Sequence, residues 1–378
     1  MSGMLSEIPL MPTRYVSRLA GLAVLILSMI AVVSWRHGNP GTVRLLEHPS
    51  LELPAPKGGR DRPLVAVLAA NDGTETTDFM VPYGVLRESG KMEVVSVSTR
   101  SGPVQLHPVL TIRAEQTTEE FDVLQPDGAD IVIVPALHRP DDPEAIRWLQ
   151  RQAESGAVIV GVCDGVLTLA HAGLLQGKSA TGHWFSLGKL TRRYRETTWI
   201  RDRRYVVDDR VVTTTGVSAS IPVSLALVEA VAGAAQADRL ALDLGIADFD
   251  AQHDSDVFGL SLELLLTLAR NKLAFWNHER FEVPIEDGID EIALALSADA
   301  WSRTYRSSAM TTHPSERWIR SRRGLVIEAE TQVANAAVTL RPAIEPSAAA
   351  LDDALMKISE RYGMPTADLV AMQLEYAW

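Results

Sequence analysis

Residues 157–172, AVIVGVCDGVLTLAHA, hold the only cysteine of the chain, Cys163. The residues before this cysteine are apolar and rich in valine, which is typical of a buried strand, and an apolar run of helical character follows it. Gly161 and Gly165 lie two residues to either side. This G-x-C-x-G pattern predicts a tight turn from a strand into a helix, in which bulkier flanking residues would clash. We therefore expect Cys163 to lie at the C-terminal edge of a sheet and at the N-terminus of a helix.

The surroundings of Cys163 act on its thiol pKa in opposite directions. The partial positive charge of a helix N-terminus favours a thiolate. The carboxylate of Asp164, the next residue, raises the thiol pKa, while the Asp164 N–H is available to an oxyanion. A lone cysteine is more often a buried structural residue. The glycine spacing and the change from strand to helix favour the reactive interpretation here.

The composition limits the class of protein. The chain has 378 residues, of which 46% are hydrophobic and 22% are charged, as in a globular protein with one large domain or two ordinary ones. Its formal net charge of −12 argues against a nucleic-acid partner. A single cysteine excludes a disulfide within the chain.

The N-terminal region predicts a membrane anchor. Residues 19–35 carry no charge, follow Arg14 and Arg18, and end at Trp35 without a small-residue cleavage site. We therefore prefer a spanning helix in the lipid bilayer to a cleaved signal peptide or a buried helix. Residues 1–18 are then a tail. Residues 36–62, with four prolines and several glycines, are an extended linker.

The orientation of this anchor is open on the sequence. The basic residues after the span place the main domain in the cytoplasm, whereas the short basic stretch before it is typical of export. We favour an extracytoplasmic main domain and keep the cytoplasm as the alternative.

Residues 63–240 have an α/β pattern. Apolar strands are expected at 64–70, 92–99, 129–136 and 157–162, with helices at 78–88, 143–153 and 218–231 and a strand pair at 205–214. Such alternation predicts a parallel sheet with helices on both faces and a reactive site beyond the carboxyl ends of its strands.

Residues 241–378 have a different pattern. Helices are expected at 257–275, 351–362 and 366–376, a strand at 281–284, and either a strand or a helix at 291–296. The last two helices are acidic, so we interpret them as a packing hairpin and not as a DNA-binding motif. Six arginines between residues 302 and 323 form a basic patch, interpreted as a solvated loop or a contact with an acidic partner. We identify no internal repeat. This region is expected to be smaller and mainly helical, and its role is open.

Three motifs together resemble the ThiJ/PfpI superfamily. They are GVCDG at 161–165, AGLLQGKSATGHW at 172–184, and VVDDRVVTTTG at 206–216. The resemblance covers about residues 63–240 and is closest to the amidotransferase-like domain of AraC-type regulators and isocyanide hydratases. It implies a flavodoxin-like parallel sheet sandwiched by helices. It also implies a nucleophilic or redox-sensing cysteine at Cys163, with an acidic residue that we assign to Asp78 in DFMVP.

Further candidates complete the predicted site. His183, twenty residues after the cysteine, could orient the thiolate and act as general base. Asp164 and Gly165 of the turn, with Ala136 and His138 after the third strand, are expected to line the pocket, although His138 also suits a solvated loop. Members of the superfamily often have a glycine pair where this chain has Ala136 and its neighbours, so the oxyanion side departs from their pattern. Asp78 also suits a helix N-cap.

Two functions remain open on the sequence. One is a cysteine-dependent hydrolase, hydratase or lyase acting on a small carbonyl or nitrile-like metabolite. The other is a metabolite or redox sensor, in which Cys163 is oxidised to a sulfinic acid beside Asp78. A transcription regulator is disfavoured because no DNA-binding module is evident. A small-molecule ligand is the expected partner, no cofactor or metal is expected, and a homodimer is left open.

Overall fold

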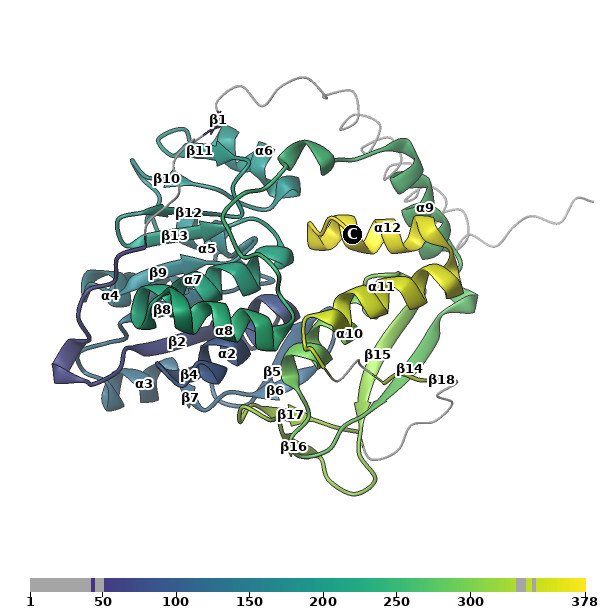
Figure 1. The fold of residues 1–378 in the computed structure, drawn as a ribbon, viewed down its shortest axis with the longest axis horizontal. Coiled ribbons are helices and arrows are strands. Elements are labelled where there is room, and N and C mark those ends of the chain that lie inside the picture. The colour runs from purple at the N-terminus through teal and green to yellow at the C-terminus, as the bar shows by residue number, and fades with distance from the viewer. Residues whose placement is uncertain (1–41, 45–50, 331–337, 342–344) are drawn as a thin grey trace, which may run out of the picture.

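The computed structural model of the chain describes residues 42–44, 51–330, 338–341 and 345–378 (Figure 1). Its largest sheet has seven strands in the order β12-β13-β9-β8-β2-β4-β7. All neighbours in it are parallel except β12 and β13, which form the predicted antiparallel pair. The strands are β2 (Leu64–Ala69), β4 (Glu93–Ser98), β7 (Gln116–Thr117), β8 (Ile131–Val134), β9 (Val158–Gly161), β12 (Tyr205–Asp208) and β13 (Val211–Thr214).

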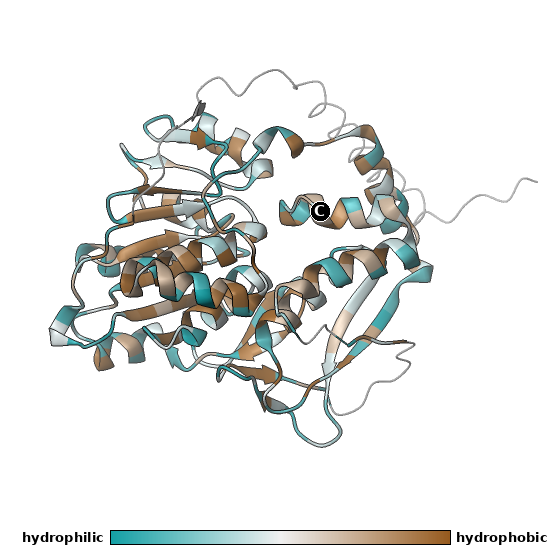
Figure 2. Ribbon diagram, in the orientation of Figure 1, coloured by the Kyte–Doolittle hydropathy of each residue, from teal (hydrophilic) through white to brown (hydrophobic). Residues whose placement is uncertain are grey.

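Helices cover both faces of this sheet, as the sequence predicted. Successive residues of a strand point to opposite faces. In β2, Val65 and Val67 accordingly belong to one hydrophobic cluster, while Leu64, Ala66 and Leu68 belong to the other. The first cluster includes α2 (Thr76–Glu88), α7 (Ser220–Ala232) and α8 (Ala234–Leu244), and the second includes α3 (Thr118–Leu124), α4 (Pro143–Glu154) and α5 (Gly165–His171). The strands and covering helices are strongly apolar in Figure 2. The predicted α/β sandwich is confirmed.

Two smaller sheets lie beside the main one. The first joins β1 (Thr42–Arg44), β11 (Thr198–Arg201) and β10 (Ser179–Ala180). The second has five strands in the order β16-β17-β6-β5-β3 and crosses the predicted boundary at residue 240. It contains β3 (Thr74–Glu75), β5 (Pro103–His107), β6 (Thr111–Arg113), β16 (Trp318–Arg320) and β17 (Val326–Glu328).

The C-terminal region contains more strand than the sequence suggested. Residues 291–296, which could be read either way, form the start of a helix, α10 (Glu291–Ser302). A parallel sheet joins β15 (Ser307–Thr312), β14 (Glu279–Pro284) and β18 (Val338–Thr339). The remaining helices are α9 (Leu262–Leu273), α11 (Ala349–Tyr362) and α12 (Met364–Leu374). Helix α10 packs against α2. One cluster of buried residues therefore spans both regions, and the predicted boundary does not separate two cores.

The N-terminal predictions have different outcomes. The expected anchor, residues 19–35, lies outside the described residues. Within the part of the chain that is described, no helix is both long enough and apolar enough to cross a membrane. The linker prediction for 36–62 is wrong at its C-terminal end, because the buried carboxylate of Asp130 binds this segment to the domain. Asp130 accepts the N–H of Lys57 at 2.8 Å and pairs with Arg60 at 3.2 Å.

Candidate functional site

The turn that carries Cys163 has the geometry predicted for a strand-to-helix elbow. Cys163 has a left-handed backbone, with φ of 53°, directly after β9 and before α5. A Cβ atom at Gly165 would lie 2.0 Å from the carbonyl oxygen of Val134, so only glycine fits there. The Cys163 N–H donates to the hydroxyl of Thr214 at 3.0 Å, which ties the turn to the end of β13. The cysteine is buried, with 8% of its surface exposed.

Asp78 lies in the first turn of α2 and is fully buried. Its Oδ2 accepts the N–H of Ala136 at 3.2 Å, and its Oδ1 has no hydrogen-bond partner among the described residues. Ala136 was predicted to supply an oxyanion donor. In this arrangement its N–H is already engaged by Asp78. The free Oδ1 is a position at which a proton or a ligand can be bound.

A cluster of buried charges surrounds the start of α2. Glu75 caps the helix by accepting the N–H of Asp78. Arg303, just after α10, donates to Glu75 and, at 2.7 Å, to Asp299 on the same helix. The hydroxyl of Thr77 lies between the two acids, 2.9 Å from Glu75 and 3.2 Å from Asp299. The C-terminal region therefore supplies an arginine and an acid to the neighbourhood of Asp78.

These charges determine the protonation of the site. Burial raises the pKa of the Cys163 thiol well above its ordinary value, and the carboxylates of Asp78 and Asp164 raise it further. Burial and Glu75 likewise raise the pKa of Asp78 well above its ordinary value. The thiol of Cys163 is thus protonated near neutral pH, and Asp78 is shifted toward its protonated form. The thiolate expected from the helix dipole is not favoured in this arrangement, because burial and nearby carboxylates outweigh the dipole.

His183 occupies the N-cap of α6 (Trp184–Arg193). Its Nδ1 accepts the N–H of Phe185 at 3.3 Å, which leaves the proton on Nε2, and Nε2 donates to the carbonyl of Gln373 at 3.2 Å. Both ring nitrogens are therefore engaged away from the cysteine. The role of His183 as a general base stays a prediction that requires Gln373 to move.

The C-terminal end of α12 covers this side of the elbow. Glu375 is 2% exposed and has a left-handed backbone, with φ of 53°. Its carboxylate accepts the N–H of Gly216 at 2.7 Å and that of Trp184 at 3.2 Å, and it lies 3.0 Å from the ring of His253. This carboxylate also raises the pKa of Cys163, after burial and the nearer acids.

The remaining predicted residues lie at different depths. Asp164 is the N-cap of α5, and its Oδ2 accepts the hydroxyl of Ser186 at 2.9 Å. Gly165 begins α5. His138 is exposed on the loop after β8, beside Gly73, so the structure places its side chain at the surface and not in the buried cluster.

Five residues of the site escaped the sequence analysis: Glu75, Thr214, Asp299, Arg303 and Glu375. Two of them carried a usable signal. Asp299 is the charged residue of the otherwise apolar stretch 292–301, and Arg303 follows it four positions later, a spacing typical of an ion pair on one helix face. Glu375 had no such signal, since its position depends on the docking of α12.

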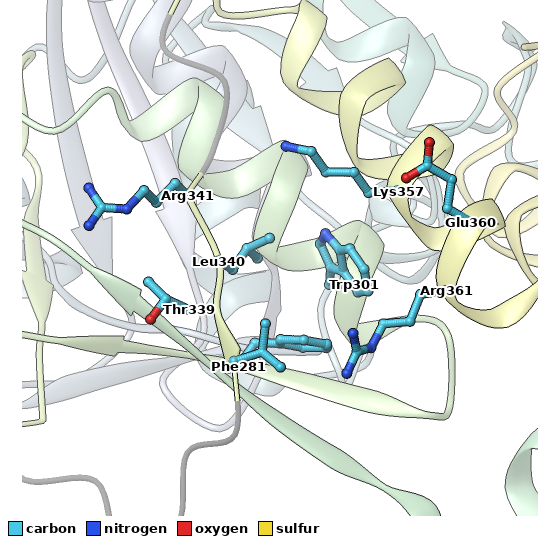
Figure 3. A pocket seen from close by; sticks show the side chains of 9 residues that line it. Phe281, Trp301, Thr339, Leu340, Arg341, Lys357, Glu360 and Arg361 are labelled. Carbon is cyan, nitrogen blue, oxygen red and sulfur yellow. The ribbon is translucent and has the colours of Figure 1, made fainter.

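A separate hollow of about 490 Å³ lies in the C-terminal region (Figure 3). Phe281 and Trp301 form its floor, and Lys357 and Arg361 extend toward it from α11. Arg361 is paired with Glu279 and Lys357 with Asp353. None of the predicted site residues lines this hollow. Within the described residues, no group of three or more His, Cys, Asp or Glu side chains is placed to hold a metal ion.

Known proteins resemble this chain over the region that contains the elbow. Residues 64–230 match the model of the DJ-1/PfpI family. The isonitrile hydratase of Pseudomonas putida is 31% identical over 180 residues, which are 45% of this chain and 73% of that protein. The chain belongs to the DJ-1/PfpI family. The ThiJ/PfpI resemblance seen in the motifs is therefore confirmed.

Other DJ-1/PfpI relatives are more distant. The HTH-type transcriptional regulator CdhR of Pseudomonas aeruginosa is 26% identical over 135 residues, 35% of this chain and 38% of that protein. Among solved structures, Drosophila melanogaster DJ-1beta has a TM-score of 0.44 and 21% identity, and the match covers 50% of this chain and all of that one. The family match ends at residue 230, so the whole C-terminal region lies beyond it.

Proposed function

We propose that this protein is a cysteine-dependent hydratase of small molecules with a reactive carbon–nitrogen or carbonyl group, with Cys163 as nucleophile and Asp78 as the proton-transfer group. The observation that carries the proposal is a left-handed elbow cysteine beside a buried acid with one free oxygen. The similarity to an isonitrile hydratase makes an isonitrile the first substrate to test.

The chemistry of hydration suits a protonated thiol and an acid whose pKa is raised toward its protonated form. The acid of Asp78 gives its proton to the terminal carbon of the isonitrile, and the sulfur of Cys163 bonds to the same carbon as its own proton passes to the Asp78 carboxylate. The product of this step is a thioimidate. Water then adds to that carbon, the carbon–sulfur bond breaks, and the sulfur regains a proton. The net reaction converts an isonitrile and water into an N-substituted formamide.

Turnover tests this proposal directly. The full chain is incubated with a small alkyl isonitrile, and the formyl proton of the product is followed by NMR. We expect formamide from the native chain, none from Cys163→Ser, and a loss of at least about 100-fold in Asp78→Asn, as for the removal of a proton-transfer group. Unchanged turnover in Cys163→Ser would refute the proposal.

A second candidate, a metabolite or redox sensor, is favoured by the burial of Cys163, of which 8% is exposed. A buried cysteine suits a ligand that binds near it without being converted. Binding of an isonitrile in calorimetry without any product, or conversion of Cys163 to sulfinic acid by peroxide in mass spectrometry, would favour the sensor.

We also propose that residues 19–35 anchor the protein in a lipid bilayer with its main domain outside the cytoplasm. The support is the uncharged run that ends at Trp35. A C-terminal alkaline phosphatase fusion is expected to be active, because this enzyme folds only after export. If the phosphatase fusion is inactive and a reporter that fluoresces only in the cytoplasm is bright on the same C-terminus, the main domain lies in the cytoplasm and the proposed orientation is refuted.

A further inference from the structure

The C-terminal region repeats the element order of the family domain. Apart from the two-residue strand β3, the domain begins with β2, α2, β4 and the hairpin β5–β6, and β8, which comes after β7 and α3, pairs beside β2. In the C-terminal region, β14, α10, β15 and the hairpin β16–β17 follow in the same order, and β18 then pairs beside β14. The sheet order β15-β14-β18 reproduces β4-β2-β8. Two folding units of the same design are therefore present in one chain.

The spacing supports a duplication over chance likeness. β2 and β14 begin 215 positions apart, as do α2 and α10, and β6 and β17. Two short motifs recur at this same separation of 215 positions. Asp72-Gly73 corresponds to Asp287-Gly288, and L-x-I-x-A-E at 110–115 corresponds to the same pattern at 325–330.

The last two helices repeat a later part of the domain. α7 and α8 are joined at Gly233, with φ of 83° and ψ of 160°, while α11 and α12 are joined at Gly363, with φ of 89° and ψ of 153°. The sequences A-D-x-x-A-x-x-L at 237–244 and 367–374 coincide, and each helix ends in a left-handed residue, Gly245 or Glu375. In the described chain β18 is the last strand before α11, so the copy lacks a counterpart of the Cys163 elbow.

The two units contact each other through equivalent surfaces. Ile112 of β6 pairs with Ile327 of β17, its own counterpart. Thr77 contacts Asp299, and their counterparts Ile292 and Gly84 also face each other. A contact in which residue i meets j and j meets i is the signature of a twofold interface between identical subunits.

The ends of the helix pairs follow the same symmetry. A Cβ at Gly216 would lie 2.5 Å from the Cβ of Glu375. A Cβ at Gly245, the counterpart of Glu375, would lie 2.4 Å from Pro346, the counterpart of Gly216. The carboxylate that covers the elbow is thus a feature of the twofold contact.

We propose that residues 279–378 are a shortened second copy of the family domain that occupies the position of a partner subunit and completes the Cys163 site through Arg303. The copy has lost its own elbow, so each chain carries one reactive site. Arg303 acts as a positioning residue. It compensates the charge of Glu75, which in turn holds the N–H of Asp78.

The first test concerns the position of the copy. Arg113 of β6 and Val326 of β17 are cross-strand partners. The full chain with Arg113→Cys and Val326→Cys, in a Cys163→Ser background, is expected to form a disulfide within one chain under mild oxidation. Disulfide-linked dimers, or no cross-link at all, on a non-reducing gel would overturn the proposal.

The second test concerns Arg303, with Arg323 as matched control. Both arginines lie between α2 and the C-terminal copy, but Arg323 pairs with Glu88 and Asp290 at the other end of the contact. The rate of alkylation of Cys163 by iodoacetamide is measured against pH in the full chain. We expect Arg303→Gln to raise the thiol pKa by about one unit, because the acids near the sulfur lose their counter-charge. Below that pKa, the rate of alkylation should then fall roughly tenfold.

The control separates positioning from general destabilisation. Arg323→Gln is expected to lower the melting temperature as Arg303→Gln does but to leave the alkylation profile within about twofold of the native chain, since its partners lie away from the sulfur. Arg303→Lys is expected to restore part of the shift. Equal shifts in Arg303→Gln and Arg323→Gln, or none in either, would overturn the proposal. The readout is alkylation, so it is independent of whether the protein hydrates isonitriles.

Discussion

At the scale of single residues, backbone space at the elbow and charge around the thiol determine the properties of Cys163. Gly165 has no room for a side chain, and the left-handed backbone of Cys163 depends on the turn that Gly165 permits. Burial, and after it the acids around the thiol, raise the thiol pKa and keep the thiol protonated. The reactive form of this cysteine therefore depends on movement of the groups around it.

Gly165→Ala is expected to destabilise the fold by about 3 kcal/mol, because its methyl group would meet the backbone oxygen of Val134. Gly161→Ala is the control, since its nearest neighbour is the side chain of Leu169, which can move. Urea unfolding measures both. A loss at Gly165→Ala no greater than at Gly161→Ala would contradict the steric account.

Glu375→Gln is expected to lower the pKa of the Cys163 thiol. The substitution removes a negative charge that raises this pKa but keeps an oxygen to accept the N–H of Gly216. The pH profile of alkylation measures the shift. Glu282→Gln, a half-buried acid on β14, controls for a change in net charge alone. An unchanged or higher thiol pKa in Glu375→Gln would show that the carboxylate does not act on the sulfur.

The sequence was sufficient for the local part of this site. The spacing of the G-x-C-x-G motif predicted the elbow of Cys163 and its glycines, and the family resemblance pointed to Asp78. Arg303, Asp299 and Glu375 come from more than 130 residues beyond the cysteine, and only packing brings them to it. For His138 the sequence left open a place in the pocket or in a solvated loop, and the loop after β8 holds its exposed side chain.

At the scale of elements, α10 joins the C-terminal copy to the site. Burial and the charge of Glu75 raise the pKa of Asp299 to about 8, although Arg303 beside it has the opposite effect. An acid whose folded pKa lies above its unfolded value binds more protons in the native state. Its contribution therefore weakens the fold as pH rises from about 4 through about 8.

Asp299→Asn is expected to remove much of this pH dependence. Urea unfolding between pH 5 and pH 9 should show the native chain losing stability with rising pH and the variant losing less. The amide keeps an oxygen that can accept from Arg303, so its packing is nearly unchanged. A parallel loss of stability in both proteins would assign the effect to other groups.

The hydrophobic pattern predicted the strands and helices of the domain, but it did not reveal the internal repeat. The two copies share few identical residues. The counterpart of Asp78 is Ala293, so the second copy lacks the acid of the site. The pairing of β6 with its counterpart β17 showed that the two copies are equivalent. Short patterns present twice, such as L-x-I-x-A-E and A-D-x-x-A-x-x-L, were the local clues.

At the scale of the whole molecule, one hydrophobic cluster joins both copies. The two units are therefore expected to unfold together, since neither can open without exposing the contact between α2 and α10. Calorimetry of the full chain should give a single transition for residues 51–378. Two separate transitions would show that the copies are independent domains.

The central claim, that Cys163 reacts covalently with the aid of Asp78, is tested most directly by trapping the intermediate. The full chain is mixed with a slight excess of a small isonitrile, quenched with acid within seconds, and weighed by intact-mass spectrometry with peptide mapping. The account predicts a mass increase of one isonitrile located on Cys163, absent from Cys163→Ser and strongly reduced in Asp78→Asn. Formamide production without any adduct on Cys163, continuing in Cys163→Ser, would contradict it.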